Sequence, residues 1–523
     1  MKTLRSYVHG QWHEADSDFR TLVNPSTEEE IARASSHGVD FAAVLDHAHR
    51  VGGPALRAMT FAERAGLLKE MSKVIRENRD ELLALSMENT GTTKADGAFD
   101  IDGATGTLAW YAGWGRKLGD GPLLAEGDGN QLARGPGFWG QHVLVPRRGA
   151  AVHINAFNFP AWGMAEKAAC SILAGMPVIT KPATATALVT ERCVELILEA
   201  DVLPEGALQM ICGGTGDLLD RLGPLDVLAF TGSAATAAGL RDRDNLRRDN
   251  TRVNVEADSL NAAVLAPEIS DAARELFYTD VVREMTQKSG QKCTAVRRIL
   301  VPEGEMGAVQ EALTSRLAEV VTGDPAADGV TMGPVATAQQ LRDTVEGVAA
   351  LAEAAEIVAG TGERVDGEGA PAGKGYFFAP TLLRAADALG AAVIHEREVF
   401  APVATLLPYG GDAAEAAEII ALGGGTLVTS VYGDNAAWLG DFVAGVGSHT
   451  GRVYIGSEGS AGDAPGSGIA MPQCLHGGPG RAGGGEELGG SIGLKLYTQR
   501  LALQGNRPLV ESLAGIGAEG DSD

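Results

Sequence analysis

The sequence predicts an α/β protein with at least two domains, and three observations support this fold class. The chain has 523 residues, more than one hydrophobic core usually holds. Residues 150–265 alternate short apolar runs with helix-length amphipathic segments, and residues 260–440 repeat the alternation. This pattern is typical of βαβ units, in which helices cover both faces of a parallel sheet and ligands bind beyond the carboxyl ends of the strands.

The segments outside these two regions differ in pattern. The first 135 residues begin with strand-like pieces and become mostly helical, and the helical pattern ends at Gly91. Residues 457–490 are too rich in glycine for regular elements, and the segment is too long for a loop without a function. Two stretches, "QHVLVP" and "SIGLKLYTQRLAL", have the pattern of strands, and we expect them to pair into a projecting arm used for association.

Composition excludes several classes of protein. The formal net charge of −25 argues against a nucleic-acid partner, because phosphate binding needs a basic stripe. No run reaches the roughly 18 apolar residues of a membrane span, and the start "MKTLRSYVHGQW" lacks the apolar core of a secretion signal. We therefore expect a cytoplasmic protein. The five cysteines lack CxxC spacing and the ten histidines lack HExxH spacing, so no metal site is expected.

Three polar residues stand out at the ends of predicted strands and in a turn. Asn158 lies in "NAFNFP", Glu256 in "NVEADSLN" and Cys293 in "QKSGQKCTAV". Taken singly, such a cysteine is usually a buried small residue, such a glutamate a surface residue and such an asparagine a turn former. Because ligands bind beyond the carboxyl ends of parallel strands, the polar residues that end these strands are the first candidates for a site.

This ordered set, with "GYFFAPTLL" and "EREVFAPV", resembles the aldehyde dehydrogenase superfamily over nearly the whole chain. The resemblance implies the aldehyde dehydrogenase fold, with a Rossmann-like cofactor domain, an α/β catalytic domain and a β-strand oligomerisation arm, and hence a homodimer or larger homo-oligomer. The implied division is a dinucleotide-binding domain at 1–135 and 149–257, a catalytic domain at 258–490, an oligomerisation arm at 136–148 and 491–506, and an acidic tail at 507–523.

The resemblance also implies a mechanism. The Cys293 thiolate adds to an aldehyde, and nearby Lys288 and Lys292 are expected to favour that thiolate electrostatically. The Asn158 amide and the Cys293 backbone N–H form the site for the resulting alkoxide. Hydride leaves to the cofactor, and Glu256 acts as the base for water that hydrolyses the thioester. Relatives that pass the acyl group to coenzyme A generally lack this base, so the product here is a free acid.

The cofactor site is predicted by "ITKPATATA", "NAFNFP", "FTGSAATAAG" and "EVFAP". Many NAD-specific relatives carry a glutamate where this chain has Thr184, so Thr184 and Lys181 imply a preference for NADP, with NAD as the alternative. Two positions depart from the family pattern, since glycines are usual where Ala237 and Ala401 stand. The resemblance further assigns to the cofactor Ala156, Phe157, Gly232, Ser233, Glu398 and Phe400.

"HINAFNFPAWGMAEK" and "HGGPGRAGGGEELGG" resemble a narrower group. It comprises the dehydrogenase part of the bifunctional phenylacetate ring-opening protein and 3,4-dehydroadipyl-CoA semialdehyde dehydrogenase of the benzoyl-CoA pathway. The resemblance implies a CoA-linked semialdehyde as substrate, first 3-oxo-5,6-dehydrosuberyl-CoA semialdehyde and second 3,4-dehydroadipyl-CoA semialdehyde. Because the chain stops soon after the last predicted strand, ring opening is assigned to another polypeptide, such as a separate enoyl-CoA hydratase-like partner.

The phosphates of coenzyme A require cations at the mouth of the substrate channel. We expect Arg481, His476 and Lys292 there, with Arg147 or Arg148 as further contributors. Two other functions stay open at this point. One is a generic dehydrogenase of succinate or amino-acid semialdehydes, and the other is a protein of this fold that binds nucleotide without turnover.

Overall fold

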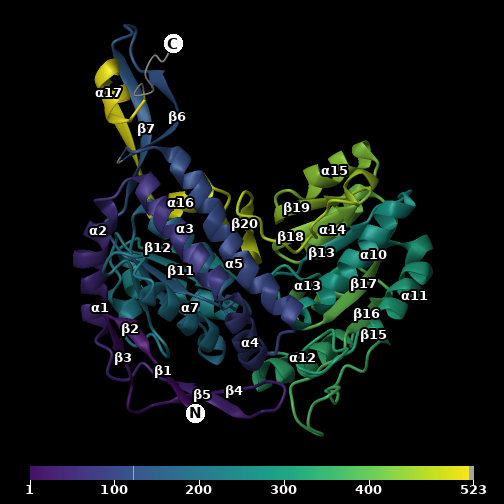
Figure 1. Ribbon diagram of the computed structural model, residues 1–523. Helices are drawn as coiled ribbons and strands as arrows, with labels where there is room; N and C mark the ends of the chain where they lie inside the picture. Colours follow the sequence, from purple (N-terminus) through teal and green to yellow (C-terminus); the bar gives the residue numbers. More distant parts are fainter. Residues whose placement is uncertain (122, 517–523) are drawn as a thin grey trace.

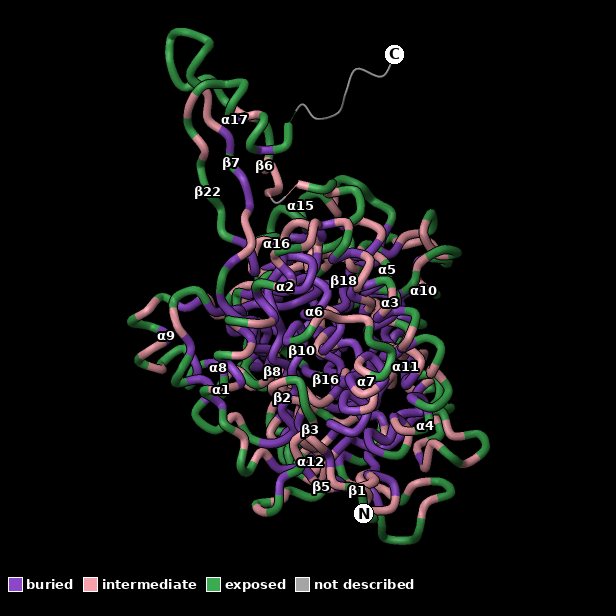
Figure 2. Tube along the Cα trace, turned by 60° about the vertical axis from the view of Figure 1, so that its left-hand side comes forward, coloured by how far each residue is buried: buried purple, intermediate pink, exposed green. Residues whose placement is uncertain are grey.

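The computed structural model describes residues 1–121 and 123–516 and consists of two α/β lobes with a narrow arm that projects from the first lobe (Figure 1). The predicted α/β class is confirmed. The strands at the centre of both lobes are buried, whereas most of the arm is exposed (Figure 2). Within the described ranges, no helix has the length and apolar character needed to cross a membrane.

The first lobe is built on a seven-stranded sheet of order β12-β11-β8-β9-β10-β2-β3. Strands β12 to β10 in this order are parallel, and β2 and β3 are added antiparallel. The chain runs outward from β8 through β9 to β10 and then returns to the other side of β8. The switch point therefore lies between β8 and β11. The strands are β2 Ser6–Val8, β3 Gln11–His13, β8 Ala151–Ile154, β9 Val178–Lys181, β10 Leu208–Met210, β11 Val227–Thr231 and β12 Arg252–Glu256.

Helices cover both faces of this sheet (Figure 1). Two of the N-terminal helices have capping residues at their ends. Thr60 and Glu63 form a capping box at the start of α3, and Gly91, with φ of 68°, ends α4 as predicted. The helices of this lobe are α1 Phe41–His47, α2 Gly53–Arg57, α3 Phe61–Glu77, α4 Arg79–Thr90, α5 Lys94–Gly115, α6 Trp162–Ala174, α7 Ala187–Glu199, α8 Ala234–Arg241 and α9 Asp244–Arg248. A small sheet of β1 Lys2–Leu4, β5 Glu30–Ala34 and β4 Arg20–Val23 completes it.

The second lobe has its own seven-stranded sheet, of order β15-β16-β17-β14-β13-β18-β19, in which only β15 is antiparallel to its neighbour. Its strands are β13 Ala262–Leu265, β14 Arg298–Pro302, β15 Ala355–Ala359, β16 Thr381–Ala385, β17 Val403–Tyr409, β18 Thr426–Tyr432 and β19 Thr450–Gly456. Its helices are α10 Asp271–Thr286, α11 Met306–Leu317, α12 Ala338–Leu351, α13 Ala392–Glu396, α14 Ala413–Ala421 and α15 Ala436–Val446.

The arm is an antiparallel sheet of order β22-β7-β6. The predicted pairing of two distant strands is confirmed, since β7 (Phe138–Pro146) pairs with β22 (Thr498–Asn506) along its whole length. The structure adds β6 (Leu124–Gln131), which the predicted boundary at residue 135 placed in the cofactor domain. The short helix α17 (Arg507–Leu513) packs on the arm, and residues 517–523 of the predicted acidic tail lie outside the described residues.

One predicted strand is wrong in its first half. Residues 491–497 form helix α16 (Ser491–Tyr497), and only from residue 498 is the chain extended. Leu494 and Tyr497 are both buried, and their spacing of three residues matches one face of a helix rather than one face of a strand. Packing of this face against α6 and β21 explains the difference.

The prediction that segment 457–490 is too rich in glycine for regular elements is wrong, because the segment contains two short strands. Strands β20 (Leu475–Gly477) and β21 (Glu486–Leu488) pair antiparallel. Between them the chain passes so close to β12 that a Cβ at Gly483, where φ is 106°, would lie 2.2 Å from the Val255 carbonyl oxygen. Glycine is therefore needed at position 483. This close approach places the β20–β21 pair next to the carboxyl end of β12.

Candidate active site

Cys293 follows a turn whose backbone is held in an unusual conformation. Lys288, Ser289 and Gly290 have φ values of 54°, 55° and 66°, and left-handed backbone is unfavourable for residues with a Cβ. A Cβ at Gly290 would also lie 2.3 Å from the Ala401 carbonyl oxygen. Such a turn persists only when its surroundings fix it.

Buried hydrogen bonds fix this turn from several sides. The Ser289 hydroxyl donates to the Gly333 carbonyl at 2.8 Å, and the Arg297 guanidinium donates to the carbonyls of Gly290 and Ala401. On the far side, the Asn261 amide donates to the carbonyls of Cys293 and Ala295 at 2.8 and 2.9 Å. The position of the thiol is therefore fixed by several separate segments of the second lobe.

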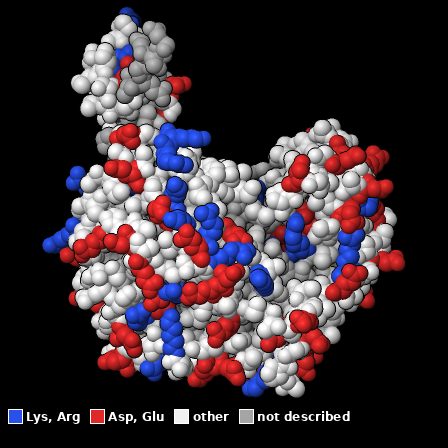
Figure 3. Space-filling model, in the orientation of Figure 1, with Lys and Arg blue, Asp and Glu red and all other residues white. Residues whose placement is uncertain are grey.

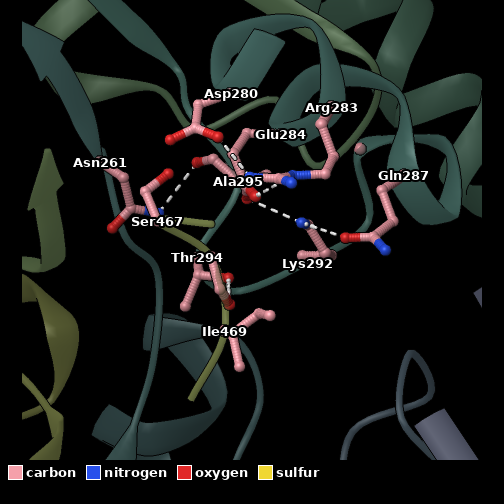
Figure 4. Close-up of polar contacts among 12 residues, drawn as sticks. Asn261, Asp280, Arg283, Glu284, Gln287, Lys292, Thr294, Ala295, Ser467 and Ile469 are labelled. Carbon is pink, nitrogen blue, oxygen red and sulfur yellow. Dashed lines mark hydrogen bonds and ion pairs between the residues drawn. The ribbon is translucent and has the colours of Figure 1, made fainter. Parts of the chain in front are cut away.

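Lys292 contributes to this rigidity rather than to substrate binding (Figure 4). Its side chain is fully buried, with Nζ 2.7 Å from Glu284 Oε2, and it donates to Gln287 Oε1 at 2.8 Å. The expectation that Lys292 lies at the mouth of the substrate channel is wrong, because the ion pair needs the side chain inside. Two residues after Lys292, the Thr294 hydroxyl donates to the Gly468 carbonyl and connects the turn to the glycine-rich segment.

Lys288 is buried as well, with Nζ 4.5 Å from the centre of the Phe159 ring. Burial lowers the pKa of Lys288, and the nearby carboxylates of Asp100 and Asp96 only partly oppose this. Both ammonium groups are thus engaged by groups other than Cys293.

His476, which was expected at the channel mouth, is instead buried beside the thiol. Its Nε2 lies 3.7 Å from Cys293 Sγ and 3.1 Å from Glu256 Oε2. The three reactive atoms all lie within 4.8 Å of one another, and Glu256 and His476 are buried. Thiol, imidazole and carboxylate can together hold zinc, but a metal-bound sulfur is not free to attack a carbonyl, so we assign the group to covalent chemistry.

The electrostatics of this group are coupled. Burial and the Glu256 carboxylate raise the pKa of the Cys293 thiol well above its ordinary value. Burial alone would lower the pKa of His476, but the Glu256 carboxylate outweighs it and raises that pKa. In turn, His476 and Lys167 hold the pKa of Glu256 below its ordinary value although burial opposes them. An ionised carboxylate beside an imidazolium is the favoured pair.

Asn158 completes the predicted catalytic set. It follows β8, lies beside the thiol on the walls of both adjoining cavities, and donates one amide hydrogen to the Gln291 carbonyl at 3.0 Å. An amide nitrogen carries two hydrogens, so the second is available to an oxygen bound at Cys293. The structure thus brings together Asn158, Glu256 and Cys293 from three separate segments, as the sequence predicted.

Sequence reasoning missed a buried charge cluster behind Glu256. Lys167 Nζ lies 3.1 Å from Glu166 and 3.2 Å from Glu487, and the Asn254 amide donates to Glu487 at 3.1 Å. Burial raises the pKa of Glu166, while the carboxylates around Lys167 raise the pKa of its ammonium against the effect of burial. The signal was present in "AWGMAEKAAC", where two charged residues interrupt an otherwise apolar helix.

Two cavities meet at Cys293. The smaller one, of about 40 Å³, is largely apolar and accommodates only the aldehyde end of a substrate. Its walls include Phe99, Phe159, Trp162, Ala470 and His476. The larger one, of about 510 Å³, opens at the switch point between β8 and β11, where a nucleotide is expected in this type of sheet.

The residues of the larger cavity fit a dinucleotide. Gly232 admits no side chain, because a Cβ would lie 2.6 Å from the Phe230 ring. Ser233 caps helix α8, whose N-terminus faces the cavity as a phosphate site requires. Among the described residues, Thr231 Oγ1 is buried without a hydrogen-bond partner, and Glu398 Oε1 has only the Arg297 guanidinium nearby, at 3.5 Å; both residues line this cavity.

The other predicted cofactor residues also have defined places. Ala156, Phe157, Lys181 and Phe400 line the large cavity, whereas Thr184 begins the short 3-10 helix Thr184–Thr186 and is not part of the wall. Lys181 is mostly buried, which lowers its pKa. Phe157 and Phe400 meet edge to face at 5.8 Å, and Arg297 lies 5.3 Å from the Phe400 ring. Burial raises the pKa of Glu398 to about 7.

The positions that depart from the family pattern are accommodated by packing. Ala237 is buried within α8, and Ala401 is fully buried beside Gly290. The close approach of the Ala401 carbonyl to Gly290 makes this alanine part of the support of the Cys293 turn.

The arginines expected at the channel mouth have structural contacts. Arg481 donates to the carbonyls of His395 and Glu396 and lines neither cavity. Arg147 is buried and donates to the carbonyls of Leu225 and Pro224, so its expected role is wrong. Arg148, unlike Arg147, is exposed to solvent.

Comparison with known proteins agrees with the fold. A model of the aldehyde dehydrogenase family matches residues 12–501, and the chain belongs to this family; it is an oxidoreductase of the aldehyde dehydrogenase class. It is 44% identical to 3,4-dehydroadipyl-CoA semialdehyde dehydrogenase of Aromatoleum evansii over 91% of this chain and 93% of that protein.

Solved structures give the same result for the fold. Lactaldehyde dehydrogenase of Escherichia coli superposes with a TM-score of 0.83 at 25% identity, covering 96% of this chain and 99% of the other. A point mutant of betaine aldehyde dehydrogenase from Staphylococcus aureus, in complex with NAD+, gives a TM-score of 0.82 at 24% identity, covering 97% and 98%.

The buried ion pair yields a stability prediction. In Lys292→Met the Glu284 carboxylate is left buried without its cation, which typically costs about 3–5 kcal/mol. We expect a lower midpoint of chemical denaturation, and partial recovery in the double variant with Glu284→Gln. The exposed Lys69→Met serves as the control and should change little. A role of Lys292 in substrate binding alone would instead change KM and leave the midpoint unaltered.

Proposed function

We propose that the chain oxidises a CoA-linked semialdehyde to the free carboxylic acid in aerobic degradation of an aromatic compound in the cytoplasm, with NADP as the hydride acceptor. The observation that carries the proposal is the meeting of Cys293, Asn158 and Glu256 where the two cavities join. A nucleotide-binding protein without turnover has no need of this arrangement. The family relationship supports the same choice.

The first half of the reaction needs a nucleophile and a place for negative charge. Cys293 Sγ attacks the aldehyde carbon, and the carbonyl oxygen becomes an alkoxide. The free Asn158 amide hydrogen and the Cys293 backbone N–H donate to this oxygen, a contribution of roughly 3–4 kcal/mol per donor in studied enzymes. When bound, the nicotinamide supplies the hydride acceptor. The acyl group then remains on Cys293 as a thioester.

The second half requires a base for water. Glu256 is ionised, because its pKa is held below the ordinary value, and it lines both cavities. One oxygen contacts His476, and the carboxylate has a second oxygen that can accept a proton from water. Attack of that water on the thioester releases the acid and restores the thiolate.

For the substrate, we now place 3,4-dehydroadipyl-CoA semialdehyde first and 3-oxo-5,6-dehydrosuberyl-CoA semialdehyde second, the reverse of the order expected from the motifs. The support is the high identity to the 3,4-dehydroadipyl-CoA semialdehyde dehydrogenase over nearly the full length of both proteins. A small apolar cavity suits the hydrocarbon end of either compound. On the face shown in Figure 3, Lys and Arg side chains are interspersed among acidic ones, which is compatible with contacts to the CoA phosphates.

Association through the arm is part of the proposal. Phe138 and Leu501 on the strands and Leu509 and Leu513 on α17 are exposed apolar side chains on a projecting sheet. Burying them against a second copy would remove this apolar surface from water. We propose a homodimer or a larger homo-oligomer.

Substrate choice is tested by comparing kcat/KM for the two CoA semialdehydes and for succinic semialdehyde. We expect 3,4-dehydroadipyl-CoA semialdehyde to be used best and succinic semialdehyde poorly, because the latter lacks the CoA moiety. Higher kcat/KM on succinic semialdehyde would favour the generic dehydrogenase instead.

Cofactor choice is tested with Thr184→Glu. A carboxylate next to Lys181 should repel the 2′-phosphate of NADP and accept hydrogen bonds from the ribose hydroxyls of NAD. We expect the ratio of kcat/KM for NADP to that for NAD to fall by roughly a hundredfold, as expected for a like-charge contact of a few kcal/mol. Thr184→Val, which adds no charge, should have a smaller effect. An unchanged ratio in the glutamate variant would remove Thr184 from the phosphate site.

The role of Glu256 is tested with Glu256→Gln. Hydride transfer should still occur while water attack slows by roughly 10²–10⁴-fold, the usual contribution of a general base. Rapid mixing should therefore show a burst of reduced cofactor that matches the enzyme concentration, followed by slow turnover, and Cys293→Ala should show no burst. Steady turnover at the unmodified rate would contradict the assignment.

A further inference from the structure

We infer that the group formed by Cys293, His476 and Glu256 binds one zinc ion, and that zinc bound there reversibly inhibits the enzyme. The inhibition rests on the proposed role of Cys293 as nucleophile, whereas the binding does not. The observation is that one sulfur, one ring nitrogen and one carboxylate oxygen of these residues all lie within 4.8 Å of one another. Thiolate, imidazole and carboxylate are the ligands that zinc binds in proteins.

The distances between these atoms fit a tetrahedral ion. With the usual lengths of zinc bonds, tetrahedral ligands lie about 3.5 Å apart for sulfur and nitrogen and about 3.3 Å apart for nitrogen and oxygen. Cys293 Sγ lies 3.7 Å from His476 Nε2, and this nitrogen lies 3.1 Å from Glu256 Oε2. Small shifts therefore bring the sulfur and the oxygen to coordination distance of an ion bound to this nitrogen.

Each ligand stands on an element that the fold holds in place. His476 lies at the centre of β20, which pairs with β21. Glu256 ends β12 and pairs with Thr231 of β11. The carbonyl of Cys293 accepts a hydrogen bond from the Asn261 amide at 2.8 Å. The three side chains thus meet before any ion arrives, which lowers the entropic cost of binding.

The charges around the sulfur favour a dication. The carboxylates of Glu256, Glu166 and Glu398 are the largest charges that act on the sulfur, and they oppose a thiolate. Negative charges that oppose an anion attract a cation. Arg297 and Arg452 also face the sulfur, but their effect on it is smaller. A metal ion ionises the thiol that binds it, so the site does not need a thiolate beforehand.

Binding exchanges two protons for the ion. The S–H bond of Cys293 and the N–H bond at His476 Nε2 break, and both electron pairs remain on the ligand atoms and form the bonds to zinc. Both protons pass to water. Glu256 is already ionised and loses no proton. Two protons carry the same charge as one zinc ion, so the net charge of the site is unchanged, and neither an oxidant nor a reductant takes part.

The smaller cavity provides the fourth position around the ion. Its walls include all three ligands, and its volume of about 40 Å³ exceeds the roughly 10–15 Å³ that one water needs. A water there completes four-coordinate zinc and occupies the space of the aldehyde end of a substrate. Magnesium and calcium prefer about six or more oxygen ligands and fit this set poorly. Zinc also engages the sulfur electron pair that would attack the aldehyde carbon, so binding and catalysis exclude each other.

The inference is tested on the full chain by titration with Co²⁺ and Zn²⁺, without substrate or cofactor. Cobalt takes the same tetrahedral sites, and a sulfur ligand gives it a charge-transfer absorption band in the near ultraviolet. We expect one equivalent of Co²⁺ to produce this band and one equivalent of Zn²⁺ to abolish it. Cys474 is exposed and is changed to serine so that it cannot contribute, and the cysteines other than Cys293 are then all buried. Absence of the band in this protein would overturn the inference.

Changes of the ligands give the second arm. Cys293→Ser should abolish the band. His476→Phe, or His476→Gln should the first variant fold poorly, should weaken Zn²⁺ binding by more than roughly a hundredfold, since removing even a residue that only supports a ligand costs about 10–100-fold. His142→Phe, at an exposed position of β7, is the matched control and should bind Zn²⁺ unchanged. Unaltered Zn²⁺ affinity after replacement of His476 would contradict the site.

Inhibition is measured separately. Zn²⁺ should stop oxidation of the CoA semialdehyde over the concentration range in which it displaces Co²⁺, and excess EDTA should restore the full rate. Zn²⁺ should also protect Cys293 from iodoacetamide in alkaline buffer, which needs no substrate. Binding without loss of turnover or without this protection would overturn the inhibitory role.

The outcome is separable from that of the proposed function. A protein that binds zinc in this way but does not oxidise CoA semialdehydes would count against the substrate. An active enzyme that gives no cobalt band would count against the zinc site.

Discussion

The structure depends on one constraint, the left-handed turn that precedes Cys293. Three consecutive residues with positive φ are unfavourable, and the surrounding chain holds them through Gly290, which alone can approach Ala401 so closely, and through the buried pair of Lys292 and Glu284. Helix α10 supplies Glu284, and β14 begins soon after the cysteine. The sheet of the second lobe, its first helix and the nucleophile are thereby joined in one rigid unit.

The first lobe supplies the groups that meet this unit. Parallel strands end at a common edge, so the segments after β8 and β12 deliver Asn158 and Glu256 to the same place. The glycine-rich segment then crosses from one sheet to the other, and its lack of side chains allows it to pass against Val255 and bring β20 to the thiol. Four separate segments thus converge where neither lobe alone would form a site.

The sequence predicted the α/β class, the pairing of the arm and the grouping of Asn158, Glu256 and Cys293, because strand ends and short motifs are local features. It did not predict what depends on distant partners. Lys292 looks like a surface cation until Glu284 is known to face it, and the helix at 491–497 forms because Leu494 and Tyr497 pack inward. The sequence placed His476 at the channel mouth, because its contacts with Cys293 and Glu256 come from residues far away in the chain.

The contact between His476 and Glu256 affects the two halves of the reaction in opposite ways. An imidazolium beside the sulfur stabilises the thiolate, both as nucleophile and as leaving group. The same charge lowers the pKa of Glu256, which keeps the carboxylate ionised but makes it a weaker base. Bases act best when their pKa lies near the working pH, so the arrangement favours attack by sulfur at the expense of proton removal from water. The second oxygen of Glu256 and the fixed position of the thioester must compensate for this weaker basicity. Release of the acid is therefore the more demanding half of the reaction.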